Sequence, residues 1–455
     1  MIQSTERRIE PRLPSGFRDL SPEEAAAQKR MIETVCKVYE SHGFVPLDTS
    51  CVEYYQILVS GHGEGGEKQI YRLCRDEMPT PESALALRFE LTASLARYLA
   101  HNIDRLPMPF KRYQSGYVWR GERPQRGRFR QFLQFDVDTV GISDPVADAE
   151  IVEVIYRSLD ALGVPGFEIR ISSRSLLAGV ARVLGLGAPE AQLEFFRVLD
   201  KHDKIGTEKL LALIGAPPSE GGLGLAAGKI ELVERILTIS GTSDRVMEEA
   251  SRLLHGPDET ARGLREISSI LEYLSSAALP HPDYVRVMPS LARGLDYYTG
   301  PVFETVVIGQ EGFGSVMGGG RYDGLIGHFL GRSIPATGVS MGVDRLLVVL
   351  QTLQAFPASG SVCRVVVAVL NPEERPRMYG LASLLRCAGI PSELYMGEGF
   401  SFRHQIAYAA QREIPYLLIQ GEDERARGIV ALRDLRTRTQ QELTLEEAVV
   451  HLRAQ

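Results

Sequence analysis

Apolar side chains recur every three or four positions over residues 22–42, and Gly43 follows this run. Such spacing predicts an amphipathic helix that ends at the glycine. Further on, the apolar run at 84–90 indicates a short strand, while residues 91–102 return to helical spacing. The first part of the chain is therefore expected to combine helices with strands.

A β-hairpin is predicted between Phe110 and Gly141. Residues 112–120 and 129–141 have strand-like patterns, and the segment between them is polar and rich in arginine. Two strands joined by such a loop pair in an antiparallel way rather than through a parallel crossover.

Helical spacing dominates the middle of the chain. Residues 146–163 predict a helix and 167–173 a strand, and helical patterns then continue from about 175 to 285, with a Gly/Pro-rich break at 215–228. Strand patterns resume at Tyr284 and at 303–308. We therefore expect residues 175–285 to form a helical module inserted into the first domain.

The last part of the chain predicts a second domain. Residues 338–352 indicate a strand or loop followed by a buried helix, and the Pro/Ser/Gly segment 356–362 is typical of a linker. From 363 to 455 strand and helix patterns alternate, which favours a small α/β domain with a mixed or mostly parallel sheet. The expected first domain spans residues 1–355.

Composition limits the class of protein. The 455 residues include 51 Lys or Arg and 58 Asp or Glu, which gives a net charge of −7, and 44% of the residues are hydrophobic. These values exclude disordered, collagen-like and disulfide-rich chains. Apolar runs such as 365–370 are too short for a membrane span, and the N-terminal residues show no targeting pattern. We expect a soluble cytosolic protein.

Cysteine and histidine usage gives no metal signal. The five cysteines are odd in number and no two have CxxC spacing, while the nine histidines are scattered. We expect reduced, partly buried thiols without a disulfide framework, and no metal site.

Arginines gather in the predicted hairpin. Guanidinium groups suit bidentate binding of phosphate oxygens, but strand side chains alternate between two faces, so only some of these groups can share a site. Acids and amides between them suit an ammonium or another polar ligand, and a solvated, charge-balanced hairpin is the alternative. The arginines are Arg112, Arg120, Arg123, Arg126, Arg128 and Arg130, and the interleaved residues are Glu122, Gln131, Gln134, Asp136 and Asp138.

A second cluster occupies residues 292–304 and 317–325. Arg293 and Asp296 precede two tyrosines, and three glycines precede Arg321. Glycines let a backbone approach a ligand closely, although a glycine run before aromatic residues also occurs as a tight turn. The GxxxxGK[ST] spacing of a phosphate-binding loop is missing from this cluster.

The order and spacing of all these segments resemble the histidyl-tRNA synthetases, a family of class II aminoacyl-tRNA synthetases, over nearly the whole chain. The hairpin is similar to class II motif 2, and the second cluster is similar to two histidine-specific blocks that other class II enzymes lack. The segments that carry the resemblance are 87–102 for the amino-acid pocket, 117–141 for motif 2, 197–210 for the helical insertion, 292–304 and 318–325 for the histidine blocks, 338–346 for motif 3, and 428–447 for the anticodon-binding domain.

This resemblance implies an α+β fold with a six-stranded antiparallel catalytic sheet, a helical insertion and a C-terminal α/β anticodon-binding domain. It also implies a homodimer and a two-step reaction. Histidine and ATP, with Mg²⁺, give histidyl-adenylate and pyrophosphate, and the histidyl group then moves to the 3′-terminal adenosine of tRNA(His). Such chemistry depends mainly on positioning and on neutralising charge at phosphate oxygens.

The resemblance further implies roles for the matching residues. Arg120 and Arg293 are the expected catalytic residues and approach the α-phosphate from two sides. The implied ATP-binding residues are Arg120, Glu122 and Phe132 near the α-phosphate and adenine, with Arg128 and Arg345 at the β- and γ-phosphates. The implied histidine-binding residues are Glu90, Gln134 and Asp138 around the α-ammonium, together with Thr92, Arg120, Arg293, Tyr297, Tyr298 and Tyr322.

Two other interpretations stay open. A paralogue that senses histidine as the regulatory subunit of ATP phosphoribosyltransferase keeps the fold without the charging reaction. Such subunits usually lack the C-terminal domain and have lost the motif 2 and histidine-block arginines. Here residues 363–455 are present, as are Arg120, Arg128, Arg293 and Arg345. An unrelated α/β nucleotide-binding protein is the third interpretation, and it leaves the ordered motifs unexplained.

Overall fold

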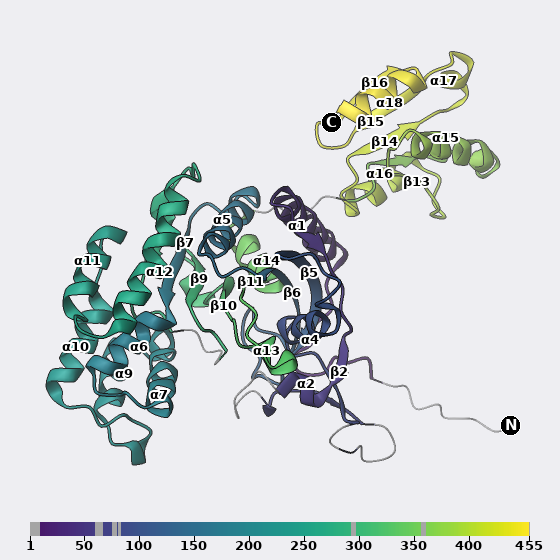
Figure 1. The fold of residues 1–455 in the computed structure, drawn as a ribbon. Helices are drawn as coiled ribbons and strands as arrows, with labels where there is room; N and C mark the ends of the chain where they lie inside the picture. Colours follow the sequence, from purple (N-terminus) through teal and green to yellow (C-terminus); the bar gives the residue numbers. More distant parts are fainter. Residues whose placement is uncertain are drawn as a thin grey trace. The chain divides into compact units, whose positions relative to one another are not determined.

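The chain forms two compact units (Figure 1), and each is described by itself. The computed structural model describes residues 10–59, 67–74, 80, 83–292, 297–355 and 361–454. The larger unit holds residues 1–19 and 28–356, and the smaller unit holds residues 20–27 and 357–455.

An eight-stranded sheet is the centre of the larger unit. Its six inner strands are antiparallel, as expected, and a short parallel strand borders each edge, which gives eight strands where six were expected. In spatial order the strands are β1 (Val45–Pro46), β5 (Phe110–Trp119), β6 (Gln131–Val140), β11 (Ala336–Gly342), β10 (Met317–Arg321), β9 (Pro301–Val307), β7 (Phe167–Ser173) and β8 (Val285–Val287).

The predicted hairpin is confirmed as strands β5 and β6, and its two faces differ in chemistry. One face of β6 carries the polar side chains of Gln134, Asp136 and Asp138, and the other carries Phe135 and Val137. The apolar face packs against helix α1 (Pro22–Ser41), whose Tyr39 ring lies 4.9 Å from the ring of Phe135. The apolar face of β6 is therefore covered by helix α1, whereas α1 does not cover the polar face.

The remaining elements of the larger unit flank this sheet. A small three-stranded sheet has the order β2 (Val52–Tyr54), β4 (Leu85–Leu87) and β3 (Arg72–Leu73). The helices outside the insertion, besides α1, are α2 (Tyr55–Val59), α4 (Thr92–Asn102), α5 (Val146–Ala161), α13 (Gly327–Leu330) and α14 (Val343–Thr352). The strand expected at 84–90 and the helix expected at 91–102 are thus present as β4 and α4.

Between β7 and β8 the described chain is helical, as the spacing predicted. Two glycines allow its first and last helices to cross closely, because a Cβ on Gly179 would lie 2.2 Å from Thr260 Oγ1 and one on Gly263 would lie 2.4 Å from the Leu176 nitrogen. The helices are α6 (Arg174–Val183), α7 (Pro189–Leu199), α8 (His202–Ile205), α9 (Thr207–Gly215), α10 (Ala227–Thr238), α11 (Ser243–Leu253) and α12 (Asp258–Ser275).

The smaller unit has a mixed sheet of the order β13 (Ser392–Leu394), β12 (Val365–Val367), β14 (Tyr416–Ile419), β15 (Val430–Asp434) and β16 (Thr439–Leu443). Its helices are α15 (Arg375–Cys387), α16 (Phe402–Gln411), α17 (Glu422–Ala426) and α18 (Leu445–Ala454). The sequence analysis missed α17 and β16. Strand β16 is polar and almost wholly exposed, so it has no apolar period to detect.

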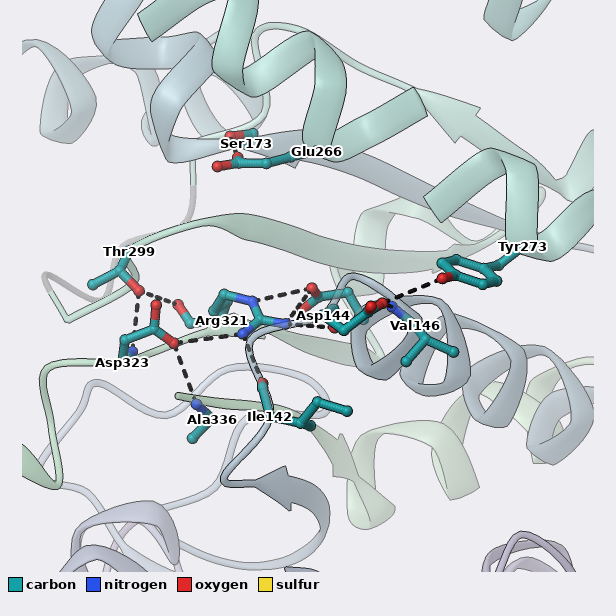
Figure 2. Close-up of polar contacts among 11 residues, drawn as sticks. Ile142, Asp144, Val146, Ser173, Glu266, Tyr273, Thr299, Arg321, Asp323 and Ala336 are labelled. Atoms are coloured by element: carbon teal, nitrogen blue, oxygen red, sulfur yellow. Dashed lines mark hydrogen bonds and ion pairs between the residues drawn. The ribbon is translucent and has the colours of Figure 1, made fainter. Parts of the chain in front are cut away.

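Arg321, at the end of β10, joins three parts of the larger unit (Figure 2). Its Nε and Nη2 donate to Asp148 Oδ2 of α5 at 3.0 and 2.6 Å, and its Nη1 donates to the carbonyl of Ile142 at 3.1 Å. Asp323 extends the network by accepting from the Ala336 nitrogen of β11. Because Arg321 and Asp148 are both buried, removal of one charge leaves the other buried and unpaired.

Arg321→Met is therefore expected to lower the free energy of unfolding by about 3–5 kcal/mol. Urea unfolding followed by the fluorescence of Trp119, the single tryptophan, measures this in the larger unit. Arg252→Met removes an exposed partner of Glu248 and is the control, with an expected loss below about 1 kcal/mol. Equal effects of the two substitutions would contradict the role given to Arg321.

Candidate active site

A cleft of about 1470 Å³ lies over the polar face of the large sheet. Arg293, one of the two expected catalytic residues, falls outside the described residues. All the other predicted site residues line the cleft: Glu90, Thr92, Arg120, Glu122, Arg128, Phe132, Gln134, Asp138, Tyr297, Tyr298, Tyr322 and Arg345.

Strand β6 sets the long axis of the cleft. Alternation places Phe132, Gln134, Asp136 and Asp138 on one face, and at about 3.3 Å per residue these side chains span roughly 20 Å. The aromatic end therefore lies apart from the acidic end by the length of an extended ligand.

Glycine at position 338 leaves room in the cleft for the side chain of Asp138. Gly338 of β11 stands opposite Asp138 in the register, and a Cβ on Gly338 would lie 2.0 Å from Asp138 Oδ1. On the next strand, Gly318 stands opposite Ser340. The glycine run of β10 is thus part of an extended strand in the cleft wall and is not a tight turn.

Two carboxylates with tyrosine partners form the acidic end. Asp138 Oδ1 accepts a hydrogen bond from the Tyr322 hydroxyl, and Glu90 Oε2 accepts one from the Tyr297 hydroxyl at 3.2 Å. Burial raises the pKa of Tyr297 and Tyr322 well above the usual value, and the neighbouring carboxylates add to this effect. Both phenols therefore stay protonated and can donate or accept hydrogen bonds.

A third carboxylate at the acidic end, Asp136, lies between Gln134 and Asp138 on the same face of β6. Burial raises the pKa of Asp138, and the Arg112 guanidinium opposes that rise. Burial likewise raises the pKa of Asp136, from an ordinary 3.8 to about 7, again opposed by Arg112. The amide of Gln134 donates to Ser340 Oγ at 2.6 Å, while its Oε1 is buried without a hydrogen-bond partner. The acidic end thus offers several acceptors to a cation.

Arg120 is held between two aromatic rings toward the other end. Its guanidinium carbon lies 4.4 Å from the ring centre of Phe89 and 5.3 Å from that of Phe132, and its Nε donates to the Phe89 carbonyl at 3.1 Å. These contacts fix a cation within the cleft, where it can meet an anionic ligand.

Further basic residues surround the loop of the hairpin. Arg128 Nε lies 2.5 Å from Glu122 Oε2, and Arg345 Nη1 donates to the Ser315 carbonyl. Asp344, next to Arg345, accepts from the Leu133 nitrogen at 2.6 Å and so ties the start of α14 to β6. The motif arginines from the hairpin and from α14 therefore share one wall of the cleft.

The solvated hairpin is wrong as a description of this whole segment. Arg123 and Arg126 are exposed, but Arg112 is fully buried, and Arg130 donates to the carbonyls of Glu122 and Ser15. The thiols also differ from expectation, since Cys51, Cys74 and Cys387 are exposed.

The cleft includes residues that the sequence analysis did not assign to it. Ser340 lies among the predicted acceptors, and so does Asp136, which the sequence analysis named among the acids suited to an ammonium but not among the histidine-binding residues. Ser340 has Gly-x-Ser-x-Gly spacing, which the sequence analysis overlooked, but it lies inside β11 and contacts Gln134. Glu304 of β9 and Arg170 of β7 complete the far wall, and no local pattern signals them.

The described residues contain no group of three or more His, Cys, Asp or Glu side chains placed to hold a metal ion. Nor does any helix in this part of the chain combine the length and apolarity needed for a membrane span.

Family models and known proteins match this chain over nearly its whole length. A model of the histidyl-tRNA synthetase family matches residues 16–346, and a model of the anticodon binding domain matches residues 364–455. Histidine–tRNA ligase of Rhizobium meliloti (strain 1021) is 38% identical over 95% of this chain and 89% of its own length. Histidine–tRNA ligase of Aeropyrum pernix is 40% identical, with 93% of each chain covered. The crystal structure of histidyl-tRNA synthetase from Nostoc sp. PCC 7120 covers 98% of this chain and 100% of its own with a TM-score of 0.85 and 29% identity.

The antiparallel sheet, the second unit and these matches define a class II aminoacyl-tRNA synthetase. Within that class, the two relatives named above are histidine–tRNA ligases. The chain belongs to the histidyl-tRNA synthetase family. The expected fold and enzyme class are confirmed, an unrelated nucleotide-binding protein is excluded, and the regulatory paralogue has less support.

Asp136 makes the stability of the ligand-free protein depend on pH. A carboxyl group whose pKa is raised on folding, here to about 7, stabilises the fold fully below the unfolded pKa, and this contribution is lost as the pH rises through the folded pKa. Asp136→Asn should therefore gain thermal stability relative to wild type between pH 5 and pH 8. Glu231→Gln, on the exposed surface of α10, controls for the lost charge. A wild-type to variant difference that is constant with pH would contradict the raised pKa.

Proposed function

We propose that the protein activates L-histidine with ATP and transfers the histidyl group to tRNA(His). One observation carries this proposal: the cleft face of β6 presents buried acceptors toward one end, and Arg120, just after β5, is fixed beside Phe132 at the other end. An amino acid is a cation at its α-ammonium and an anion at its carboxylate, so this face can orient both groups at once.

Histidine occupies the acidic end. Glu90, Gln134 and Asp138 accept hydrogen bonds from the ammonium, which has donors only. The imidazole lies among Tyr297, Tyr298 and Tyr322, whose hydroxyls can pair with its one donor and one acceptor nitrogen. Thr92 lines the same pocket.

ATP occupies the aromatic and basic end. Its adenine stacks on Phe132 and meets Glu122, while Arg128 and Arg345 hold the β- and γ-phosphates. The ion pair between Glu122 and Arg128 then opens or shifts as the nucleotide arrives. Arg120 and Arg293 bind the α-phosphate, and both also meet the histidine carboxylate.

Mg²⁺ accompanies ATP in this proposal. Mg²⁺ commonly keeps several waters and takes one or two carboxylates together with substrate phosphates, so it needs no full set of protein ligands. Among the described cleft residues, Glu304 is the candidate carboxylate, since it lines the wall opposite the hairpin. When bound, the ion neutralises phosphate charge.

The reaction proceeds by two displacements. A histidine carboxylate oxygen attacks the α-phosphorus, the bond to the bridging oxygen breaks, and pyrophosphate leaves with the electron pair. Arg120 and Arg293 stabilise the charge that develops on the α-phosphate oxygens. The 3′-terminal ribose hydroxyl of tRNA then attacks the carbonyl carbon, loses its proton, and AMP leaves.

The domain roles follow from the same proposal. Residues 1–355 catalyse both steps, with the helical module of 175–285 inserted, residues 356–362 link, and residues 363–455 bind the anticodon region of tRNA(His). The protein acts as a homodimer in the cytoplasm.

Charging of tRNA tests the proposal directly. Radiolabelled histidine should become acid-precipitable with a tRNA(His) transcript and ATP, and not with a transcript for another amino acid. Histidine binding by calorimetry without any charging would overturn the proposal and favour the regulatory paralogue.

Arg120→Ala should lower the rate of histidine-dependent pyrophosphate exchange about 100- to 1000-fold, because one preorganised donor to the α-phosphate is lost. Arg123→Ala is the matched control, since Arg123 is exposed on the same loop and does not line the cleft. Equal exchange rates in the two variants would remove Arg120 from the catalytic residues.

A further inference from the structure

A buried guanidinium lies directly beneath the acidic end of the cleft and has no part in the reaction described above. Arg112 of β5 stands opposite Asp138 in the register and is 0% exposed, the largest fully buried side chain of the described chain. It does not line the cleft. Arg112 therefore does not contact a ligand in the cleft directly, and it can affect one only through its neighbour Asp138.

Among the described residues, Arg112 has one carboxylate within ion-pair distance and no hydrogen-bond partner. Its Nη2 forms an ion pair with Asp138 Oδ2 at 2.7 Å, but Nε, Nη1 and Nη2 are all buried without a hydrogen-bond partner. Burial of a cation costs several kcal/mol unless other charges compensate for it. The compensation here comes from carboxylates, which points to an electrostatic role.

Three carboxylates share this region with Arg112, namely Glu90, Asp136 and Asp138. If all are ionised the local charge is 1 − 3 = −2, and an incoming α-ammonium reduces it to −1. Without the guanidinium the same group would carry −3 in a buried site, and protonation would relieve it. Arg112 thus preserves the negative charge that a cationic substrate group needs.

The described groups around Asp136 and Asp138 come from several elements, and they include no second cation. Asp138 Oδ1 accepts from the Tyr322 hydroxyl, and Asp138 Oδ2 lies next to the Arg112 guanidinium, so each carboxylate oxygen has a neighbour that favours one position. The other groups that act on this pair of acids are Tyr39 of α1, Ser340 of β11 and Glu90 before α4. Of all these groups, Arg112 is the only cation.

We propose that Arg112 is a positioning residue that holds the Asp138 carboxylate ionised and oriented to accept the α-ammonium of the amino acid. The proposal rests on the histidine-activating function proposed above. Arg112 acts only through Asp138 and its neighbours, so its effect falls on the amino acid and not on ATP.

Arg112→Met tests this through pyrophosphate exchange measured from pH 6.5 to 8.5. The KM for histidine should rise about 10- to 100-fold at pH 7, which corresponds to one or two units of pKa, while the KM for ATP changes less than about 3-fold. Loss of the cation raises the pKa of Asp138 further, so the acid is protonated at low pH. The histidine KM of the variant should therefore fall as the pH rises.

Two further measurements separate positioning from general damage. Arg112→Lys keeps the charge and should recover most of the affinity with a flatter pH profile. L-Histidinol, which retains the ammonium and lacks the carboxylate, should lose inhibitory strength by the same factor as histidine in Arg112→Met. Arg88→Met is the matched control, because Arg88 is a buried arginine whose partners are the carbonyls of Tyr117 and Thr49.

Several results would overturn the proposal. Parallel increases in the KM of histidine and ATP, or a pH profile like that of Arg88→Met, would make Arg112 merely structural. If Arg112→Met does not fold, the charge-removing but polar Arg112→Gln carries the test in the wild-type and Asp138→Asn backgrounds, and a loss of histidine affinity by calorimetry that is as large in the Asp138→Asn background as in the wild-type background would also overturn the proposal. Wild-type protein without histidine-dependent exchange would refute the proposed function itself, whereas active wild type with unaffected variants would refute only the role of Arg112.

Discussion

Antiparallel pairing of β5, β6 and β11 is the constraint on which the rest of the structure depends. Pairing fixes the alternation of side chains, so one residue of slippage would exchange the polar and apolar faces of β6. The apolar face is fixed by α1 through Tyr39 and Phe135. With that face buried, the acids and the amide of β6 have no place except the cleft.

The same pairing explains why a strongly charged site can exist within a buried sheet. Arg112 lies opposite Asp138, and Gly338 lies on the other side of it, so charge is compensated from one neighbour and space is provided by the other. Arg120, set between Phe89 and Phe132, places a cation at the far end of the strand. Opposite charges thus lie toward opposite ends of β6, the acids on the strand and Arg120 beside Phe132, and that arrangement suits a ligand with an ammonium at one end and phosphates at the other.

Local sequence patterns predicted the elements that carry an apolar period, such as α4, β6 and the helical insertion. They missed β16, whose exposed polar residues have no such period. The acids and amides between the hairpin arginines were recognised as suited to an ammonium, and Gln134, Asp136 and Asp138 among them line the cleft. Arg112 was recognised only as one of several arginines, because its complete burial follows from the register with Asp138, and a register is a property of two strands.

The central claim is that the two ends of this strand face form one adenylation site for histidine. ATP–pyrophosphate exchange with each of the twenty amino acids, without tRNA, tests it most directly. The account predicts exchange that depends on histidine and on no other amino acid. Absence of exchange with histidine, or equal exchange with a second amino acid, would contradict it.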